Sequence, residues 1–199
     1  MRRLGRPPGA CEHFAPAGAR PAVARGCSTR GDSMQNRKGS LFFALYVACA
    51  ATFVWATSLG LPDLVASHFG AAGAANGFMT RTFYMLFMVA FVIGLPALMV
   101  FVTWHAVGNA RARLSLPNRN YWLAPERRAE TIALLRVGIL CFGALLVTFL
   151  CYAHGLVVLA NEAQPVHLAQ SWFIGGLVVY FVVLFVGVRS FLGRFRRSV

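Results

Sequence analysis

Residues 83–103 read FYMLFMVAFVIGLPALMVFVT and contain no Asp, Glu, Lys or Arg. A helix needs about 20 apolar residues to cross the hydrocarbon core of a bilayer, so this stretch is long enough to span it. The stretch does not alternate between apolar and polar residues, as the strands of a membrane barrel do. Because every backbone N–H and C=O must be satisfied inside lipid, the stretch predicts a transmembrane helix.

Three other parts of the chain have the same character. Charged residues are absent for 24 residues after Lys38, for 25 residues after Arg136 and for 26 residues after Glu162. Each of these gaps holds one crossing, and none comfortably holds two. The sequence therefore predicts an all-α membrane protein, a four-transmembrane-helix bundle. The predicted spans are residues 41–60, 83–104, 132–156 and 172–191.

The overall composition agrees with burial in a lipid bilayer. The chain is 58% hydrophobic and 13% charged, whereas soluble domains carry about 25% charged residues. The net charge of +13 needs no nucleic-acid partner, because we find no groove-reading or base-stacking element that such a partner requires.

The distribution of Lys and Arg predicts the orientation. Of the 19 such residues, 18 lie before the first span, between the second and third or just inside the third, and at the end of the fourth; Arg81 alone lies on the other side. The side rich in Lys and Arg faces the cytoplasm. We therefore expect a bacterial inner (plasma) membrane protein with both termini cytoplasmic. Basic residues flanking the spans should fix this topology and contact anionic lipid headgroups. These topology anchors are Arg37, Lys38, Arg127, Arg128, Arg194, Arg196 and Arg197.

Residues 1–33 differ from the rest of the chain. They are rich in Arg, Ala, Gly and Pro and have no apolar periodicity, so they cannot bury enough apolar surface to fold. We expect a disordered N-terminal extension and hypothesise that Met34 is the natural start. Residues 34–199 then form the membrane domain.

The loop between the first two spans, residues 61–81, is the most distinctive stretch. Pro62 and Asp63 favour a helix start, and Gly70 can end a helix. We therefore expect a short helix resting at the membrane interface. Its apolar side would be formed by Leu64, Val65 and Phe69.

The rest of this loop should return the chain to the membrane. Gly73 and the pair Asn76-Gly77 tolerate positive φ and suit turns. Thr80 or Thr82 can cap the second span.

The same loop resembles a known family. The order Leu-Pro, His-Phe, Gly, Asn-Gly and a basic residue before a span is similar to that of domain-of-unknown-function family 1648. The resemblance covers about residues 45–105, and the residues that carry it are Leu61, Pro62, His68, Phe69, Gly73, Asn76, Gly77 and Arg81. It implies a domain shared with bacterial immunity proteins of the sporulation-delaying killing system, which protect a producing cell from its own secreted toxin. Those immunity proteins are longer and carry a further membrane domain.

Catalysis and metal binding have little support in the sequence. Ser67 and His68 are adjacent, but a nucleophile and its base need a third, orienting group. His68, His154, Glu162 and His167 are candidates to converge on a transition metal, yet no close His pair supports this. We expect no enzyme, no metal and no cofactor.

The predicted function is that of a non-catalytic membrane protein. It would be a sensor, immunity or accessory factor whose first outer loop meets a protein or peptide partner. The alternative is a small oligomeric transporter or channel subunit. His154 is the one ionisable residue well inside a span, and such residues mark transport pathways.

Overall fold

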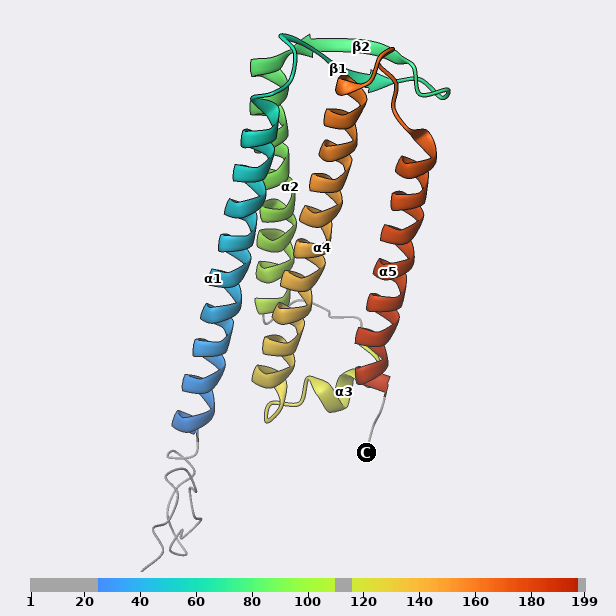
Figure 1. Ribbon diagram of the computed structural model, residues 1–199. Helices are drawn as coiled ribbons and strands as arrows, with labels where there is room; N and C mark the ends of the chain where they lie inside the picture. The colour runs from blue at the N-terminus through green and yellow to red at the C-terminus, as the bar shows by residue number, and fades with distance from the viewer. Residues whose placement is uncertain (1–24, 110–115, 197–199) are drawn as a thin grey trace, which may run out of the picture.

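The computed structural model describes residues 25–109 and 116–196, with side chains described from residue 37 onward. Within these residues, four helices are long and apolar enough to cross a membrane. They are α1 (Arg25–Ser58), α2 (Arg81–Gly108), α4 (Arg128–Glu162) and α5 (Gln170–Arg196). Figure 1 shows them running side by side, with the short helix α3 (Arg119–Trp122) at one end and a two-stranded hairpin at the other. The predicted all-α architecture with four spans is confirmed, and the chain is a multi-pass membrane protein.

The helices extend beyond the predicted spans because a helix does not stop where the hydrocarbon core stops. α1 includes residues 25–33, which we had predicted to be disordered. Once the apolar part of the helix exists, each further residue adds one hydrogen bond without new nucleation. Residues 1–24 and Arg197 lie outside the described residues, and the start at Met34 stays a prediction.

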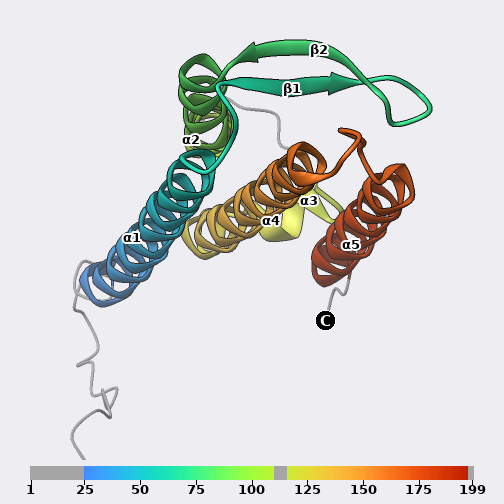
Figure 2. The same cartoon turned by 45° about the horizontal axis from the view of Figure 1, so that its top comes forward.

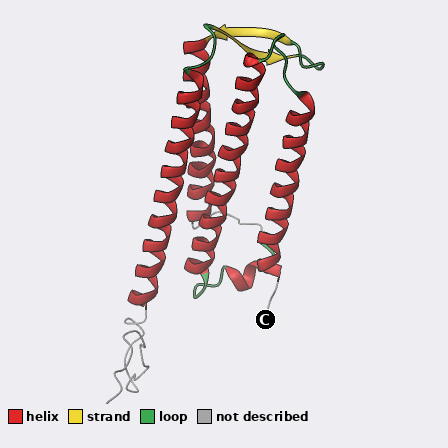
Figure 3. Ribbon diagram, in the orientation of Figure 1, coloured by secondary structure: helices red, strands yellow, loops and turns green. Residues whose placement is uncertain are grey.

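The loop between α1 and α2 is a β-hairpin, so the predicted interfacial helix after Pro62 is wrong. β1 (Leu64–Phe69) pairs antiparallel with β2 (Ala75–Thr80), and Figure 3 shows this pair as the only strands in the described chain. Asn76-Gly77 lies within β2 and not in a turn.

The physical reason is that one face of β1 meets the helix ends. Val65 is buried beside Leu61 and Tyr84, with Met79 of β2 packed against the same cluster. Val65 and Met79 are direct cross-strand partners. Cross-strand partners lie on the same face of a sheet. Burying that face stabilises the strand by more than the local residues favour a helix.

The bundle is organised around α4. α4 packs against α1, α2 and α5, whereas α5 has α4 as its main neighbour. Figure 2 shows α5 standing beside α4 and away from α1. The main core lies between α1, α2 and α4 and consists of Val47, Ala50, Val54, Val92, Val147 and Leu150.

Gly143 lies where the three core helices are in close contact. A Cβ atom on Gly143 would lie 2.9 Å from Phe43 Cε2 and 2.9 Å from Val100 Cγ2. A residue without a side chain therefore lets α4 approach α1 and α2 together.

We predict that Gly143→Val destabilises the bundle by about 1–3 kcal/mol, the usual cost of overpacking a well-packed site. Gly155→Val on the same helix is the matched control, since nothing lies within 4 Å of its Cβ position. Thermal unfolding in detergent micelles measures both. Equal unfolding temperatures for the two variants would contradict the close three-helix contact.

Candidate functional site

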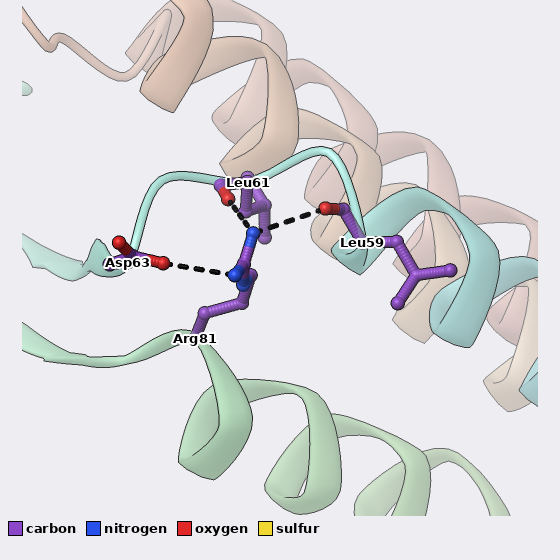
Figure 4. A network of polar contacts seen from close by, with 4 residues as sticks. All are labelled: Leu59, Leu61, Asp63 and Arg81. Carbon is purple, nitrogen blue, oxygen red and sulfur yellow. Dashed lines mark hydrogen bonds and ion pairs between the residues drawn. The ribbon is translucent and has the colours of Figure 1, made fainter.

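The hairpin is closed at its base by Arg81, the first residue of α2. The guanidinium Nη2 lies 2.9 Å from Asp63 Oδ1, and Nη1 donates to the carbonyl oxygens of Leu59 and Leu61 at 3.3 and 3.1 Å (Figure 4). Asp63 is 94% exposed, so the ion pair itself contributes little. The carbonyl bonds matter more, because they place a cation just beyond the C-terminal end of α1. Arg81 thus ties α1, the hairpin and α2 together.

The middle of β1 is held by Asn161 near the end of α4. Asn161 Oδ1 accepts from Ala66 N at 2.8 Å, and Asn161 Nδ2 donates to Ala66 O at 2.9 Å. The amide therefore satisfies both backbone groups of Ala66, as a neighbouring strand would. This contact covers the outer edge of β1 and fixes the hairpin over α4.

The tip of the hairpin is held by the linker between α4 and α5. Leu168 N donates to Gly73 O at 2.8 Å, and His167 Nε2 lies 2.8 Å from Ala72 O. Gly73 has φ +82°, and a Cβ there would lie 2.5 Å from Leu168 O. Only glycine suits both the left-handed backbone and this close approach. The prediction of a turn at Gly73 is confirmed.

A buried polar cluster lies among the helices below the hairpin. His154 of α4 has Nε2 2.8 Å from Thr57 Oγ1 of α1 and Nδ1 2.9 Å from the Tyr84 hydroxyl of α2. Thr57 Oγ1 also donates to Phe53 O at 2.7 Å. The network therefore assigns Nε2 as the donor to Thr57 and Nδ1 as the acceptor from Tyr84. With an uncharged imidazole, both ring nitrogens and both hydroxyl groups have a hydrogen-bond partner. The cluster therefore links three helices.

The predicted motif residues divide into structural and exposed ones. Leu61 is buried in the core cluster with Val65 and Tyr84. Gly77 faces His68, since a Cβ on Gly77 would lie 2.9 Å from the His68 Cβ. Phe69 is half-buried, and the exposed members are Pro62, His68 and Asn76.

The remaining predictions at this end have mixed outcomes. Thr80 caps α2 by accepting from Phe83 N at 3.4 Å, as predicted. Ser67 Oγ lies 3.1 Å from His68 Nδ1. The described residues hold no group of three His, Cys, Asp or Glu able to bind a metal ion.

Sequence reasoning missed the Asn161 contact and all but His154 of the polar cluster. The partners of these side chains lie 70 to 97 residues away, so no local spacing predicts them. The sequence did contain one indication of the polar cluster, since each of three apolar stretches has a polar residue near its end.

The hairpin also presents apolar side chains outward. Leu64 is 60% exposed and Phe78 is 54% exposed. Both lie on the strand face opposite Val65 and Met79, as the pairing register requires.

Residues 44–100 match the family model described as Domain of unknown function (DUF1648). The matched segment contains most of the apolar part of α1, the whole hairpin and the first two-thirds of α2. No curated protein and no solved structure matches the chain. The chain thus carries a DUF1648 domain, and the match places the hairpin at its centre.

We predict that Asn161→Leu loosens the hairpin selectively. Loss of two hydrogen bonds to Ala66 should lower the stability of the hairpin by about 1–3 kcal/mol, at about 0.5–1.5 kcal/mol each. Hydrogen exchange at the Ala66 amide should accelerate while the helix amides stay protected. Glu162→Gln, a neighbouring exposed residue, serves as the control. Unchanged protection of Ala66 would show that Asn161 does not hold the strand.

We also predict that Tyr84→Phe destabilises the protein by about 0.6 kcal/mol and at most about 1.7 kcal/mol, the range for hydrogen bonds between membrane helices. Tyr180→Phe is the matched control, because no hydrogen bond of the Tyr180 hydroxyl is found within the described chain. Unfolding in detergent measures the difference. Equal stability of the two variants would contradict the prediction that the polar cluster links the helices.

Proposed function

We propose that this protein is a non-catalytic inner-membrane protein whose hairpin binds an extended segment of a protein or peptide partner on the outer face. The observation that carries the proposal is the state of the two strand edges. The outer edge of β1 is covered by Asn161, whereas β2 has β1 as its one strand neighbour in the described chain. An open edge is a template for a further strand.

The pairing register identifies the backbone groups that a partner would use. Ala66 gives both its backbone groups to Asn161 and faces Phe78 across the hairpin. Ala66 and Phe78 therefore form a non-hydrogen-bonded pair, in which the backbone groups of each residue point away from the other strand. The N–H and C=O of Phe78 point to the open edge of β2.

The side chains beside this edge support recognition of an apolar segment. Leu64 and Phe78 are exposed on one face. In strand addition, main-chain hydrogen bonds supply affinity and alternate side chains supply specificity. The exposed Phe78 ring at the open edge, with Leu64 on the same face of the neighbouring strand, suits a partner with alternating apolar residues.

The attachment of the hairpin supports a role in sensing. Arg81, Asn161 and the linker around Leu168 hold it at three points. A template fixed in this way loses little conformational entropy when a partner binds. Because Arg81 begins α2 and Asn161 lies on α4, a displaced hairpin would act directly on two helices. This arrangement fits a sensor, immunity or accessory factor.

The orientation belongs to the same proposal. Both ends of the described chain lie at the opposite end of the bundle from the hairpin (Figure 1). Among the residues whose side chains the structure describes, Arg81 is the one Lys or Arg in or beside the hairpin. The positive-inside rule therefore supports an outward-facing hairpin.

We predict that Phe78→Pro abolishes peptide binding more strongly than Phe78→Ala. Both variants lose the aromatic ring, but only proline removes the N–H at the open edge. Peptides selected from a random displayed library on the protein in nanodiscs provide the ligands. Phe78→Pro should bind them at least tenfold more weakly than Phe78→Ala, as the loss of one hydrogen bond of about 1.4 kcal/mol implies.

Proline should be tolerated at this position, because the N–H of Phe78 is not used by β1. Retained protection of the Ala66 amide would verify that the hairpin is intact. Equal affinities of the two variants would contradict strand addition. The same variants can be expressed in a deletion strain. If that strain is sensitive to secreted toxins, and Phe78→Ala restores resistance whereas Phe78→Pro does not, the result would support immunity. Altered solute uptake without toxin sensitivity would favour the transporter alternative.

A further inference from the structure

We propose that the protein binds one anionic phospholipid at the membrane end opposite the hairpin, with the phosphate at Arg136 and an acyl chain between α1 and α2. The site is distinct from the hairpin and does not depend on the function proposed for it. It combines a cation, the cavity beside it and a neighbouring apolar groove.

Arg136 is the cation, and one nitrogen of its guanidinium lacks a hydrogen-bond partner in the described structure. Arg136 Nε is buried and makes no hydrogen bond in the described structure. The guanidinium lies 4.5 Å from the centre of the Trp104 ring, and the ion pair found in the described chain is that of Asp63 with Arg81. A buried donor without an acceptor requires an explanation.

A polar cavity of about 490 Å³ opens beside this guanidinium. Its lining residues are Trp104, His105, Gly108, Asn109 and Arg136. Gly108 brings the backbone close, because a Cβ there would lie 3.2 Å from Arg136 Nη2. Arg128 adds a second cation at the rim, where its Nη2 donates to Asn109 O at 3.4 Å. Arg136 therefore supplies the positive charge of the lining, and Arg128 contacts one of the lining residues.

An apolar groove of about 440 Å³ adjoins the polar cavity. Trp104 and His105 line both spaces, so the two lie side by side. The groove lies between α1 and α2 and is lined by apolar residues that include Phe43, Val47, Ala97, Val100 and Leu140. It leads from the membrane end toward the middle of the bundle.

This combination matches an anionic phospholipid. A guanidinium binds a phosphate through two parallel hydrogen bonds, and Arg136 lines the cavity that would hold the phosphate. Basic pockets between membrane helices recognise anionic headgroups. The adjoining groove gives the attached acyl chain an apolar surface, which a free anion would not use. The lining contains the cation Arg136 and no carboxylate, and Arg128 contacts the lining residue Asn109, so the site favours a net negative headgroup over a zwitterionic one.

The test uses the full chain in detergent and measures lipid retention by native mass spectrometry. Phosphatidylglycerol is the anionic probe, phosphatidylcholine the zwitterionic probe and inorganic phosphate the free-anion probe. Arg136→Gln should reduce phosphatidylglycerol retention at least tenfold. Arg189→Gln is the matched control, since Arg189 is an exposed arginine of α5, and it should change retention less than twofold.

Two further variants separate the parts of the site. Ala97→Leu fills the groove and should reduce retention of phosphatidylglycerol severalfold without changing the response to phosphate. Arg136→Lys keeps the charge but loses the paired donors, and it should retain the lipid less well than wild type and better than Arg136→Gln. It also provides a comparison if Arg136→Gln folds poorly.

Three results would overturn the proposal. The first is equal retention of phosphatidylcholine and phosphatidylglycerol. The second is an equal loss of phosphatidylglycerol retention in Arg136→Gln and Arg189→Gln. The third is displacement of the lipid by millimolar phosphate together with no effect of Ala97→Leu. The last result would identify a site for a free anion.

Discussion

Lipid offers no hydrogen-bond partners, and this constraint governs the whole structure. It requires the four spans to be helices, because a helix satisfies its backbone within itself. It also requires each polar side chain in a span to find a partner in the protein. His154 does so through Thr57 and Tyr84. Asn161 does so through the backbone of Ala66, and this contact joins the membrane bundle to the hairpin above it. Arg136 differs, since its buried Nε has no hydrogen-bond partner in the described chain.

The spans could be predicted from the sequence because they depend on length and apolar content alone. The hairpin could not, because the segment from Leu64 to Thr80 is short and the preceding Pro62 and Asp63 also suit a helix start. The choice between helix and strand is made by distant groups. Asn161 lies 95 residues from Ala66, and Tyr84 supplies part of the surface that buries Val65. No local pattern contains this information.

The sequence likewise predicted one part of the candidate site and not the other. Arg81 and Gly73 stood out in the sequence and have clear structural roles, in closing the base of the hairpin and in forming its tip. His68 and Asn76 are exposed, and their importance to a partner stays a prediction. The open edge of β2 could not be predicted, because it follows from the register of Ala66 with Phe78. Register depends on the paired structure and not on either strand alone.

The contact between the hairpin tip and the linker before α5 has a consequence for biosynthesis. Gly73 O accepts from Leu168 N, so the start of α5 is positioned by a segment made about ninety residues earlier. Chains fold from the N-terminus as they are synthesised. The hairpin and the first three long helices can therefore assemble while α5 is still being translated. The hairpin tip then acts as a template for the last helix, which joins a preformed unit through α4.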